Sequence, residues 1–167
     1  MKTNAVRILD KLGIGYQLRE YDVDPNDLSA EAVASKVGIQ LSSTYKTLVC
    51  KGDKSGYCFA VIAGDRELDL KVLAAASGDR ACSLVPLKDV QPLTGYIRGG
   101  VTVLGAKKAF SAFIDSAALE LSSISVSGGM RGLQILIAPR DYVKATGATA
   151  IDKLGRTAAM LLTLARQ

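Results

Sequence analysis

The alternation of apolar and polar residues along the chain predicts several short amphipathic helices. Apolar residues recur three and four positions apart over residues 4–12, 30–37, 68–78 and 139–147. Thr3 and Ser29 stand where they would cap the first two of these helices, and Gly13 and Gly38 stand where they would end them. Pro139 would open the last helix, because proline is favoured in a first turn. A further helical turn is expected over residues 86–90.

Short strands are predicted between these helices. Residues 16–21, 81–84, 113–115, 124–127 and 133–138 have strand-like patterns, and residues 45–50 and 57–63 predict a hairpin around the turn KGDKSG. The run CFAVIA in the second hairpin strand is apolar at every position. We therefore expect this strand to be central in a sheet, with both of its faces covered.

The irregular order of helices and strands predicts an α+β fold. We expect a mixed, largely antiparallel sheet that is curled toward a barrel and flanked by helices. A length of 167 residues fits one domain, which we place at residues 1–150. Residues 151–167 are expected to form a C-terminal helical tail that packs on the core or on a second subunit. The oligomeric state stays open.

The absence of histidine limits the chemistry of the protein. With no histidine in the sequence, neither a Ser-His-Asp triad, nor a Cys-His pair, nor a histidine-ligated zinc site can form. Cys50, Cys58 and Cys82 have neither the spacing of a disulfide framework nor that of a Cys-x-x-Cys motif. We therefore expect three small hydrophobic side chains in a reducing cytoplasm, and neither a metal nor a cofactor.

Charge and hydropathy give weaker indications. Lys and Arg total 21 against 16 Asp and Glu, a formal net charge of +5, which permits contact with a polyanion but is equally typical of ordinary solvated surfaces. No apolar run approaches the roughly 20 residues that span a bilayer, and the first residues lack the apolar run of a signal peptide. A cytoplasmic protein without membrane contact is expected.

Lys46 and two glycine-rich loops are the first candidates for a functional site. Lys46 lies near the start of an apolar strand, where it would bind an anion or a carbonyl, or would simply extend its amine to solvent. The loop at residues 95–105 and the loop SGGMRG at residues 127–132 could direct backbone N–H groups at an anion, and they could equally be turns. Four further polar residues, which are structural by default, are Tyr21, Asp65, Asp115 and Asp141.

Eight separated segments resemble one known family in their order and spacing. These segments are YDVDP (21–25), YKTL (45–48), LDLK (68–71), TGYIRGG (94–100), LGAKK (104–108), SAALE (116–120), VSGGMRGL (126–133) and APRDY (138–142). Together they resemble the YbaK family of aminoacyl-tRNA deacylases, which is related to the editing insertion domain of bacterial prolyl-tRNA synthetase. The resemblance covers roughly residues 4–148, and it is strongest to the branch that removes cysteine from proline tRNA.

The resemblance implies a trans-editing hydrolase that deacylates Cys-tRNA(Pro), and also Cys-tRNA(Cys), without a cofactor. In the implied reaction the thiol of the substrate attacks its own ester and releases a thiolactone. Lys46 matches the invariant lysine of the family, and Gly99 or Gly100 through Gly105 matches its glycine loop, with Val103 where the family pattern has proline. The implied catalytic residues are Lys46 and Gly100. The implied substrate-binding residues are Tyr21, Tyr45, Gly99, Gly105, Ser127, Gly128 and Asp141.

Two alternatives to cysteine editing stay open. The first is an editor of another small aminoacyl group, such as Ala-tRNA(Pro), which would need an activated water. The second is a non-catalytic module that binds or regulates a synthetase. The implied partners are the acceptor end of tRNA and prolyl-tRNA synthetase, and the net charge supports only a weak, salt-sensitive contact with tRNA.

Overall fold

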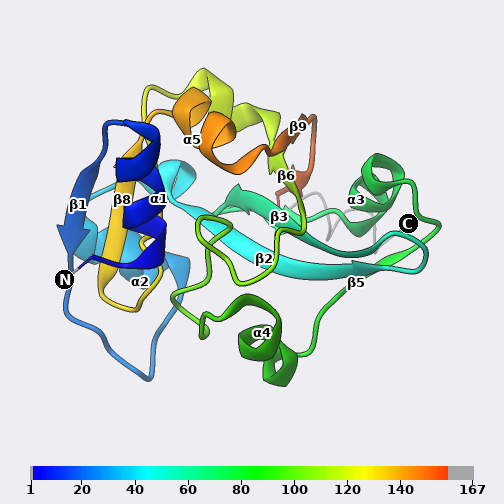
Figure 1. The fold of residues 1–167 in the computed structure, drawn as a ribbon, viewed down its shortest axis with the longest axis horizontal. Helices are drawn as coiled ribbons and strands as arrows, with labels where there is room; N and C mark the ends of the chain where they lie inside the picture. The colour runs from blue at the N-terminus through cyan, green and yellow to red at the C-terminus, as the bar shows by residue number, and fades with distance from the viewer. Residues whose placement is uncertain (1, 158–167) are drawn as a thin grey trace.

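The chain folds into an α+β arrangement of two small sheets, one strand pair and flanking helices (Figure 1). The structure is a computed structural model and describes residues 2–157. One sheet has the strand order β5 (Cys82–Leu84), β2 (Tyr45–Gly52), β3 (Gly56–Ala63), β6 (Ser111–Asp115) and β9 (Thr149–Ile151). The other has the order β1 (Gln17–Glu20), β8 (Leu133–Ile137) and β7 (Ile124–Ser127). The strand pair is formed by β4 (Glu67–Leu68) and β10 (Gly155–Arg156).

The helices lie close to the ranges that the apolar spacing predicts. They are α1 (Asn4–Leu12), α2 (Ala30–Val37), α3 (Leu70–Ser77), α4 (Leu87–Thr94) and α5 (Pro139–Thr146), with 3₁₀ turns η1 (Leu41–Ser43) and η2 (Ser116–Glu120). Thr3 and Ser29 accept hydrogen bonds from Val6 N–H and Ala32 N–H. Gly13, at φ 69°, ends α1 in the left-handed conformation that favours glycine. The four predicted helices are confirmed, and α4 is a full helix where only a helical turn was predicted.

The sheet topology confirms a mixed, largely antiparallel arrangement. β2 pairs antiparallel with β3 and β5, whereas β6 pairs parallel with β3 and β9, and all pairs in the smaller sheet are antiparallel. A single parallel bridge between Thr44 and Ser125 joins the start of β2 to β7. The two sheets therefore meet at one edge, as a curled arrangement requires, without closing into a barrel over the described residues.

Strand β3 is the central strand that the run CFAVIA predicts. It lies between β2 and β6, and its residues from Cys58 to Ala63 are buried. Phe59 and Val61 face one apolar cluster with α1, β7 and β8, while Ala60 and Ile62 face a second cluster with α3. Each fully buried large side chain of this kind stabilises the fold by about 1.5–3 kcal/mol. Figure 1 shows the β2–β3 hairpin running across the molecule, with α5 and α4 on opposite sides in this view.

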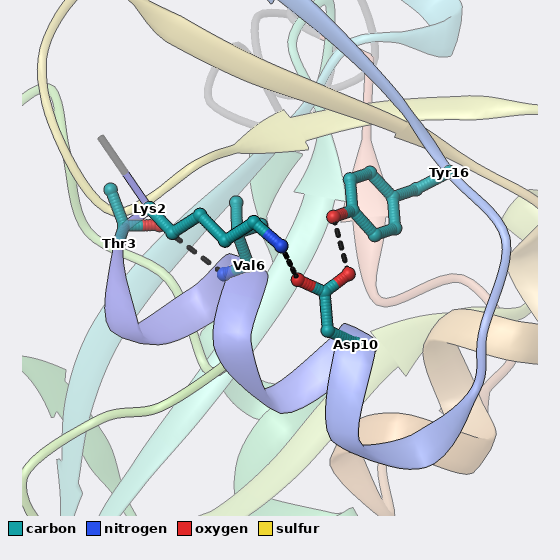
Figure 2. Close-up of polar contacts among 5 residues, drawn as sticks. All are labelled: Lys2, Thr3, Val6, Asp10 and Tyr16. Atoms are coloured by element: carbon teal, nitrogen blue, oxygen red, sulfur yellow. Dashed lines mark hydrogen bonds and ion pairs between the residues drawn. The ribbon is translucent and has the colours of Figure 1, made fainter.

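Helix α1 is fixed at its start and on its outer face by polar contacts. The Thr3 hydroxyl, besides capping the helix, donates to the Gly128 carbonyl at 2.6 Å. Figure 2 shows Asp10 between two donors, the Lys2 ammonium at 2.6 Å and the Tyr16 hydroxyl at 2.6 Å. These exposed contacts each contribute little free energy, but the bond from Thr3 joins α1 to the loop at residues 127–132.

The end of the described chain differs from the predicted helical tail. Residues 149–156 form β9, a turn and β10, and Leu154 is fully buried. The turn places Lys153 at φ 59°, and the Leu154 carbonyl accepts from Asp69 N–H. The apolar spacing that predicts a helix here instead reflects two short strands, because Leu154 packs against the α3 cluster. The rest of the predicted tail, residues 158–167, lies outside the described residues, and a domain boundary at residue 150 stays a prediction.

Over residues 2–157, no helix is long and apolar enough to cross a membrane.

Candidate functional site

A pocket of about 490 Å³ lies along the part of β2 that β5 does not cover. Five segments form its walls: the start of α2, strand β2, the connection from β5 to α4, the loop at residues 98–101, and the ends of β7 and β8. Among its apolar lining residues are Leu28, Val33, Leu48, Val49, Val85, Leu87 and Val90. Among its polar lining residues are Ser29, Glu31, Thr44, Lys46, Thr47, Arg98, Ser127 and Gln134.

Strand register explains why Lys46, Ser127 and Gln134 line the same wall. Thr44 and Ser125 form the parallel bridge, so Lys46 and Ser127, two residues further along each strand, project from the same face. Ser127 is in turn the antiparallel partner of Gln134. A row of three polar side chains therefore crosses from β2 through β7 to β8.

Lys46 is available to bind a ligand. Its side chain is half-buried, and among the described residues it forms neither a hydrogen bond nor an ion pair. Arg98 adds a second cation to the lining, and Glu31 is the one carboxylate among the described lining residues. An unpaired ammonium on a largely apolar wall favours a ligand that carries a negative charge or a carbonyl oxygen.

Ser127 can also donate a hydrogen bond into the pocket. Its Oγ accepts from Gly129 N–H at 3.2 Å, which leaves the hydroxyl hydrogen free for another partner. Tyr45, which also lines the pocket, is 4% exposed. Burial and then the nearby Asp115 carboxylate raise the pKa of Tyr45 to about 12, so this phenol stays protonated at neutral pH.

The glycine-rich loop at residues 95–105 reaches the pocket at Arg98, Gly99 and Val101. Gly99, at φ 88°, lies against Leu28 and Arg131. Arg131 Nε donates to the Arg98 carbonyl at 2.7 Å and so fixes this loop to the loop at residues 127–132. Among the described residues the Gly99 N–H has no hydrogen-bond partner, so it is a candidate donor to a ligand.

Gly100, a predicted oxyanion donor, uses its N–H within its own loop. Its N–H donates to the Ile97 carbonyl at 2.9 Å, closing a turn, and the residue does not line the pocket. A Cβ at this position would lie 3.0 Å from Met130 Cα. The structure therefore gives Gly100 a packing reason to be glycine, because the two glycine-rich loops approach each other closely here.

Gly105 and Gly128 also serve packing rather than the pocket. A Cβ on Gly105 would lie 2.9 Å from the Asn4 carbonyl carbon, where the loop crosses the start of α1. Gly128 N–H donates to the Leu133 carbonyl at 2.9 Å and closes the β7–β8 hairpin. Val103, at the position of the family proline, is half-buried and packs against the core cluster.

Tyr21 and Asp141 lie away from the pocket. Tyr21 lines a separate depression of about 870 Å³, together with Lys2, Lys36, Met130 and Arg131. Asp141 lies in the first turn of α5, where a carboxylate stabilises the helix dipole. Of the nine predicted site residues, the structure brings together Tyr45, Lys46, Gly99 and Ser127 in one pocket.

Two of the default structural residues have that role in the structure. Asp115 is buried, caps η2 by accepting from Ala117 N–H, and accepts from Gly155 N–H at 2.7 Å. Asp65 follows β3 in a turn and pairs with Arg66 at 3.6 Å. Neither residue lines the pocket.

Glu31, Arg98 and Gln134 also line the pocket, although the sequence did not predict a role for them. Arg98 stands inside the segment TGYIRGG but looks like any exposed arginine. Gln134 carried a usable signal, since it interrupts the apolar strand LQILI and a buried polar side chain needs a partner. Nothing in the sequence around Glu31 marks it as a pocket residue.

The cysteines are poor nucleophiles in this structure. Cys50 and Cys58 are buried in the α3 cluster, and burial raises the pKa of their thiols to about 12 and about 11. Cys82 is half-buried, and burial also raises the pKa of its thiol. The prediction that Cys50 and Cys58 act as small hydrophobic residues is confirmed. Over residues 2–157, no group of three or more acidic or cysteine side chains is arranged to hold a metal ion.

Comparison with known proteins identifies one family. Residues 24–145 match the model of the aminoacyl-tRNA editing domain. The chain is 43% identical over 145 residues to EbsC of Enterococcus faecalis, which is named for deacylation of Cys-tRNA(Pro) and Cys-tRNA(Cys), covering 87% of this chain and 88% of EbsC. It is 28% identical over 118 residues to the multifunctional Ser/Thr-tRNA deacylase ProXp-y of Escherichia coli, covering 68% and 71% of the two chains.

A solved structure has the same fold. It is described as a trans-editing enzyme for prolyl tRNA synthetase, and it superposes with a TM-score of 0.76 at 23% identity, covering 92% of this chain and 99% of the other.

Proposed function

The chain belongs to the aminoacyl-tRNA editing domain family, and from this premise we propose that it removes cysteine from mischarged Cys-tRNA(Pro). It is an aminoacyl-tRNA deacylase, and its proposed substrates include Cys-tRNA(Cys), which the name of EbsC also covers. The observation that carries the proposal is Lys46, which lies on the wall of a largely apolar pocket and has no side-chain partner among the described residues. Such a pocket can hold a small aminoacyl group while its cation binds an oxygen of the ester.

Hydrogen-bond donors and a carboxylate lie on different sides of the pocket. Lys46 and Ser127 can donate hydrogen bonds from the β2 and β7 side, while Glu31 in the first turn of α2 can accept them through its carboxylate. An aminoacyl ester has the complementary arrangement, with a carbonyl oxygen that accepts hydrogen bonds and an α-ammonium that donates them. We place the carbonyl toward Lys46 and the ammonium toward Glu31.

The thiol of the substrate supplies the nucleophile in the proposed reaction. Its sulfur attacks the ester carbonyl carbon, the new C–S bond closes a thiolactone, and the C–O bond to the terminal ribose breaks. The thiol proton ends on the ribose oxygen, so the tRNA leaves with a free hydroxyl, and water opens the thiolactone afterwards. A thiol with a pKa near 8.5 provides some thiolate at neutral pH, and an intramolecular attack gains a large effective molarity.

The side chains of the protein fit a supporting role in this reaction. The sequence has no histidine to act as a base, and none of its cysteines lines the pocket. Lys46 stabilises the negative charge that develops on the carbonyl oxygen, which is the larger part of catalysis in many acyl transfers. Gly99 N–H is a second proposed donor to the same oxygen.

Recognition of the tRNA body is proposed to come from a partner. The net charge of +5 supports weak, salt-dependent contact with the acceptor end and no reading of one particular tRNA. We therefore propose that prolyl-tRNA synthetase supplies specificity for proline tRNA, in a cytoplasmic setting.

A panel of charged tRNAs tests the substrate and the mechanism together. The purified protein is mixed with Cys-tRNA(Pro), Cys-tRNA(Cys), Ala-tRNA(Pro), Ser-tRNA(Pro) and S-methylcysteinyl-tRNA(Pro), and the remaining ester is measured over time. We expect loss of cysteine well above the buffer rate and an intact S-methylcysteinyl ester, because the blocked thiol cannot attack.

Other results of the panel have defined meanings. Loss of the S-methylcysteinyl ester at the same rate as the cysteinyl ester of tRNA(Pro) would contradict attack by the substrate thiol. Loss of alanine or serine without loss of cysteine would show an editor for another small aminoacyl group. No loss of any ester would contradict a deacylase and would support a non-catalytic binding module.

A further inference from the structure

We propose that Gln134 is a fixed hydrogen-bond donor to the carbonyl oxygen of the aminoacyl ester, held in position by Ser125. This inference rests on the proposed function and extends it, because it assigns a second side chain, Gln134 on β8, to the oxygen atom that Lys46 on β2 binds. Nothing in the sequence resemblance gives a role to Gln134.

The burial of Gln134 requires a reason. The side chain lies within the strand LQILI, is 5% exposed, and is flanked along β8 by buried apolar residues. Burying an amide without partners costs about 1–3 kcal/mol in protein mutational data. One partner is present, since the Ser125 hydroxyl donates to Gln134 Oε1 at 2.9 Å, and Ser125 is itself 1% exposed.

This bond fixes which end of the amide faces the pocket. Oε1 is held against Ser125, so the Nε2 group is the end that remains for another partner. Among the described residues Nε2 has no hydrogen-bond partner, although Gln134 lines the pocket. Nε2 is also not completely enclosed. In the described part of the chain the Tyr142 hydroxyl is the one polar side-chain atom that is both fully buried and without a partner, so Nε2, which has no partner, must be partly accessible. The amide hydrogens are therefore available to a ligand in the pocket.

The neighbours of Gln134 indicate which atom of the substrate it binds. Ser127, its direct partner across β7 and β8, uses its oxygen to accept from Gly129 N–H and keeps its hydrogen. Lys46 follows on the same face and can only donate. Side chains opposite each other in a sheet have Cβ atoms about 4.5–5.5 Å apart, so one oxygen can contact two or three of these groups.

Three adjacent groups that can each donate a hydrogen bond, one of them a cation, suit an oxygen that becomes negative. The carbonyl oxygen of the ester gains charge when the thiol attacks, whereas the α-ammonium would be repelled by Lys46. A donor aimed at that oxygen stabilises the transition state more than the bound substrate, so its loss should lower kcat more than it raises KM.

Four variants test the proposal on Cys-tRNA(Pro). Gln134→Met keeps the volume but removes the donor, and we expect kcat to fall on the order of 100-fold with a smaller change in KM. Ser125→Ala releases the amide, and we expect kcat to fall by about 3–10-fold, as the loss of one positioning hydrogen bond implies. The double variant should be no slower than Gln134→Met alone, because Ser125 acts through the amide. Gln17→Met, on exposed strand β1 of the same sheet, is the matched control and should retain full activity.

Three results would overturn the proposal. They are a wild-type kcat in Gln134→Met, losses from Ser125→Ala and Gln134→Met that multiply in the double variant, and an equal loss in Gln17→Met. Circular dichroism and thermal unfolding of each variant establish that the protein measured is folded.

A binding measurement separates this inference from the proposed function. The probe is adenosine that carries cysteine through a 3′-amide in place of the ester, titrated into the protein by calorimetry. We expect Gln134→Met to bind it about 3–10-fold more weakly than wild type, since the amide carbonyl also accepts the bond. If wild type hydrolyses no charged tRNA, the proposed function fails, while unchanged probe binding in Gln134→Met contradicts the inference itself.

Discussion

Replacing Gly128 with alanine should destabilise the protein through one side-chain contact. Gly128 closes the β7–β8 hairpin, and an added Cβ would lie 2.6 Å from Leu133 Cγ and 3.1 Å from the Leu133 carbonyl oxygen. Leu133 is 5% exposed and belongs to the main apolar cluster, so neighbouring side chains prevent it from changing rotamer to avoid the added Cβ. The backbone at Gly128 does not have a positive φ, and the whole effect is therefore steric.

The expected cost is that of overpacking a core. Forcing an extra carbon into a packed site costs about 1–3 kcal/mol. For a chain of this size, 2 kcal/mol lowers Tm by about 4–8 °C. Urea unfolding at pH 7, followed by circular dichroism, measures the free energy of unfolding, and a thermal scan gives Tm.

Gly15→Ala is the matched control for this experiment. Gly15 does not have a positive φ, and no atom of the described residues lies within 4 Å of an added Cβ. Alanine should therefore stabilise the protein by about 0.4–1 kcal/mol, because it restricts the unfolded chain. A Gly128→Ala variant as stable as the Gly15→Ala variant would refute the reasoning. Leu133→Ala in the Gly128→Ala background should cost less than it does alone, because it removes the clash.

Two further substitutions test polar groups outside the pocket. Among the described residues the fully buried Tyr142 hydroxyl has no hydrogen-bond partner of acceptable geometry, so Tyr142→Phe should raise the free energy of unfolding by about 1 kcal/mol in urea. A loss of stability would show that the hydroxyl bonds to Thr47 instead. Asp79→Asn should lower stability at pH 7, because hydrogen bonds from the side chains of Ser55 and Ser77 hold the pKa of Asp79 well below its usual range. A lowered folded pKa stabilises the protein above the unfolded pKa near 3.9, and that contribution is lost as the pH falls through the folded value. The stability difference between wild type and Asp79→Asn should therefore narrow from pH 5 to pH 2, and a constant difference across this range would contradict the assignment.

The helices and strands were predictable wherever a local signal determines them. Thr3 and Ser29 cap their helices because a short side-chain oxygen can reach an N–H two or three residues on, and this depends only on local sequence. The run CFAVIA is apolar on both faces, and only a central strand buries both. Residues 149–156 could not be assigned in this way, because β9 and β10 pair with β6 and β4, which are distant in the sequence.

Part of the candidate site was predictable, because local sequence marks some of its residues but does not specify how distant strands align. Lys46 is marked by its position in an apolar strand, and Ser127 by its glycine-rich turn. The alignment of Lys46, Ser127 and Gln134 depends on the bridge between Thr44 and Ser125, which no local pattern specifies. The close approach of Gly100 to Met130 could not be predicted, because a glycine that permits close packing and a glycine that exposes its N–H look alike in a sequence.

The comparison of Lys46→Ala with Lys51→Ala on Cys-tRNA(Pro) tests the central claim most directly. Both lysines lie on β2, but Lys51 is exposed, lies over the Tyr57 ring at 5.2 Å and does not line the pocket. Single-turnover deacylation should be abolished in Lys46→Ala and unchanged in Lys51→Ala, with both variants folded. Full activity in Lys46→Ala, or an equal loss in both variants, would contradict a catalytic role for the Lys46 ammonium in this pocket.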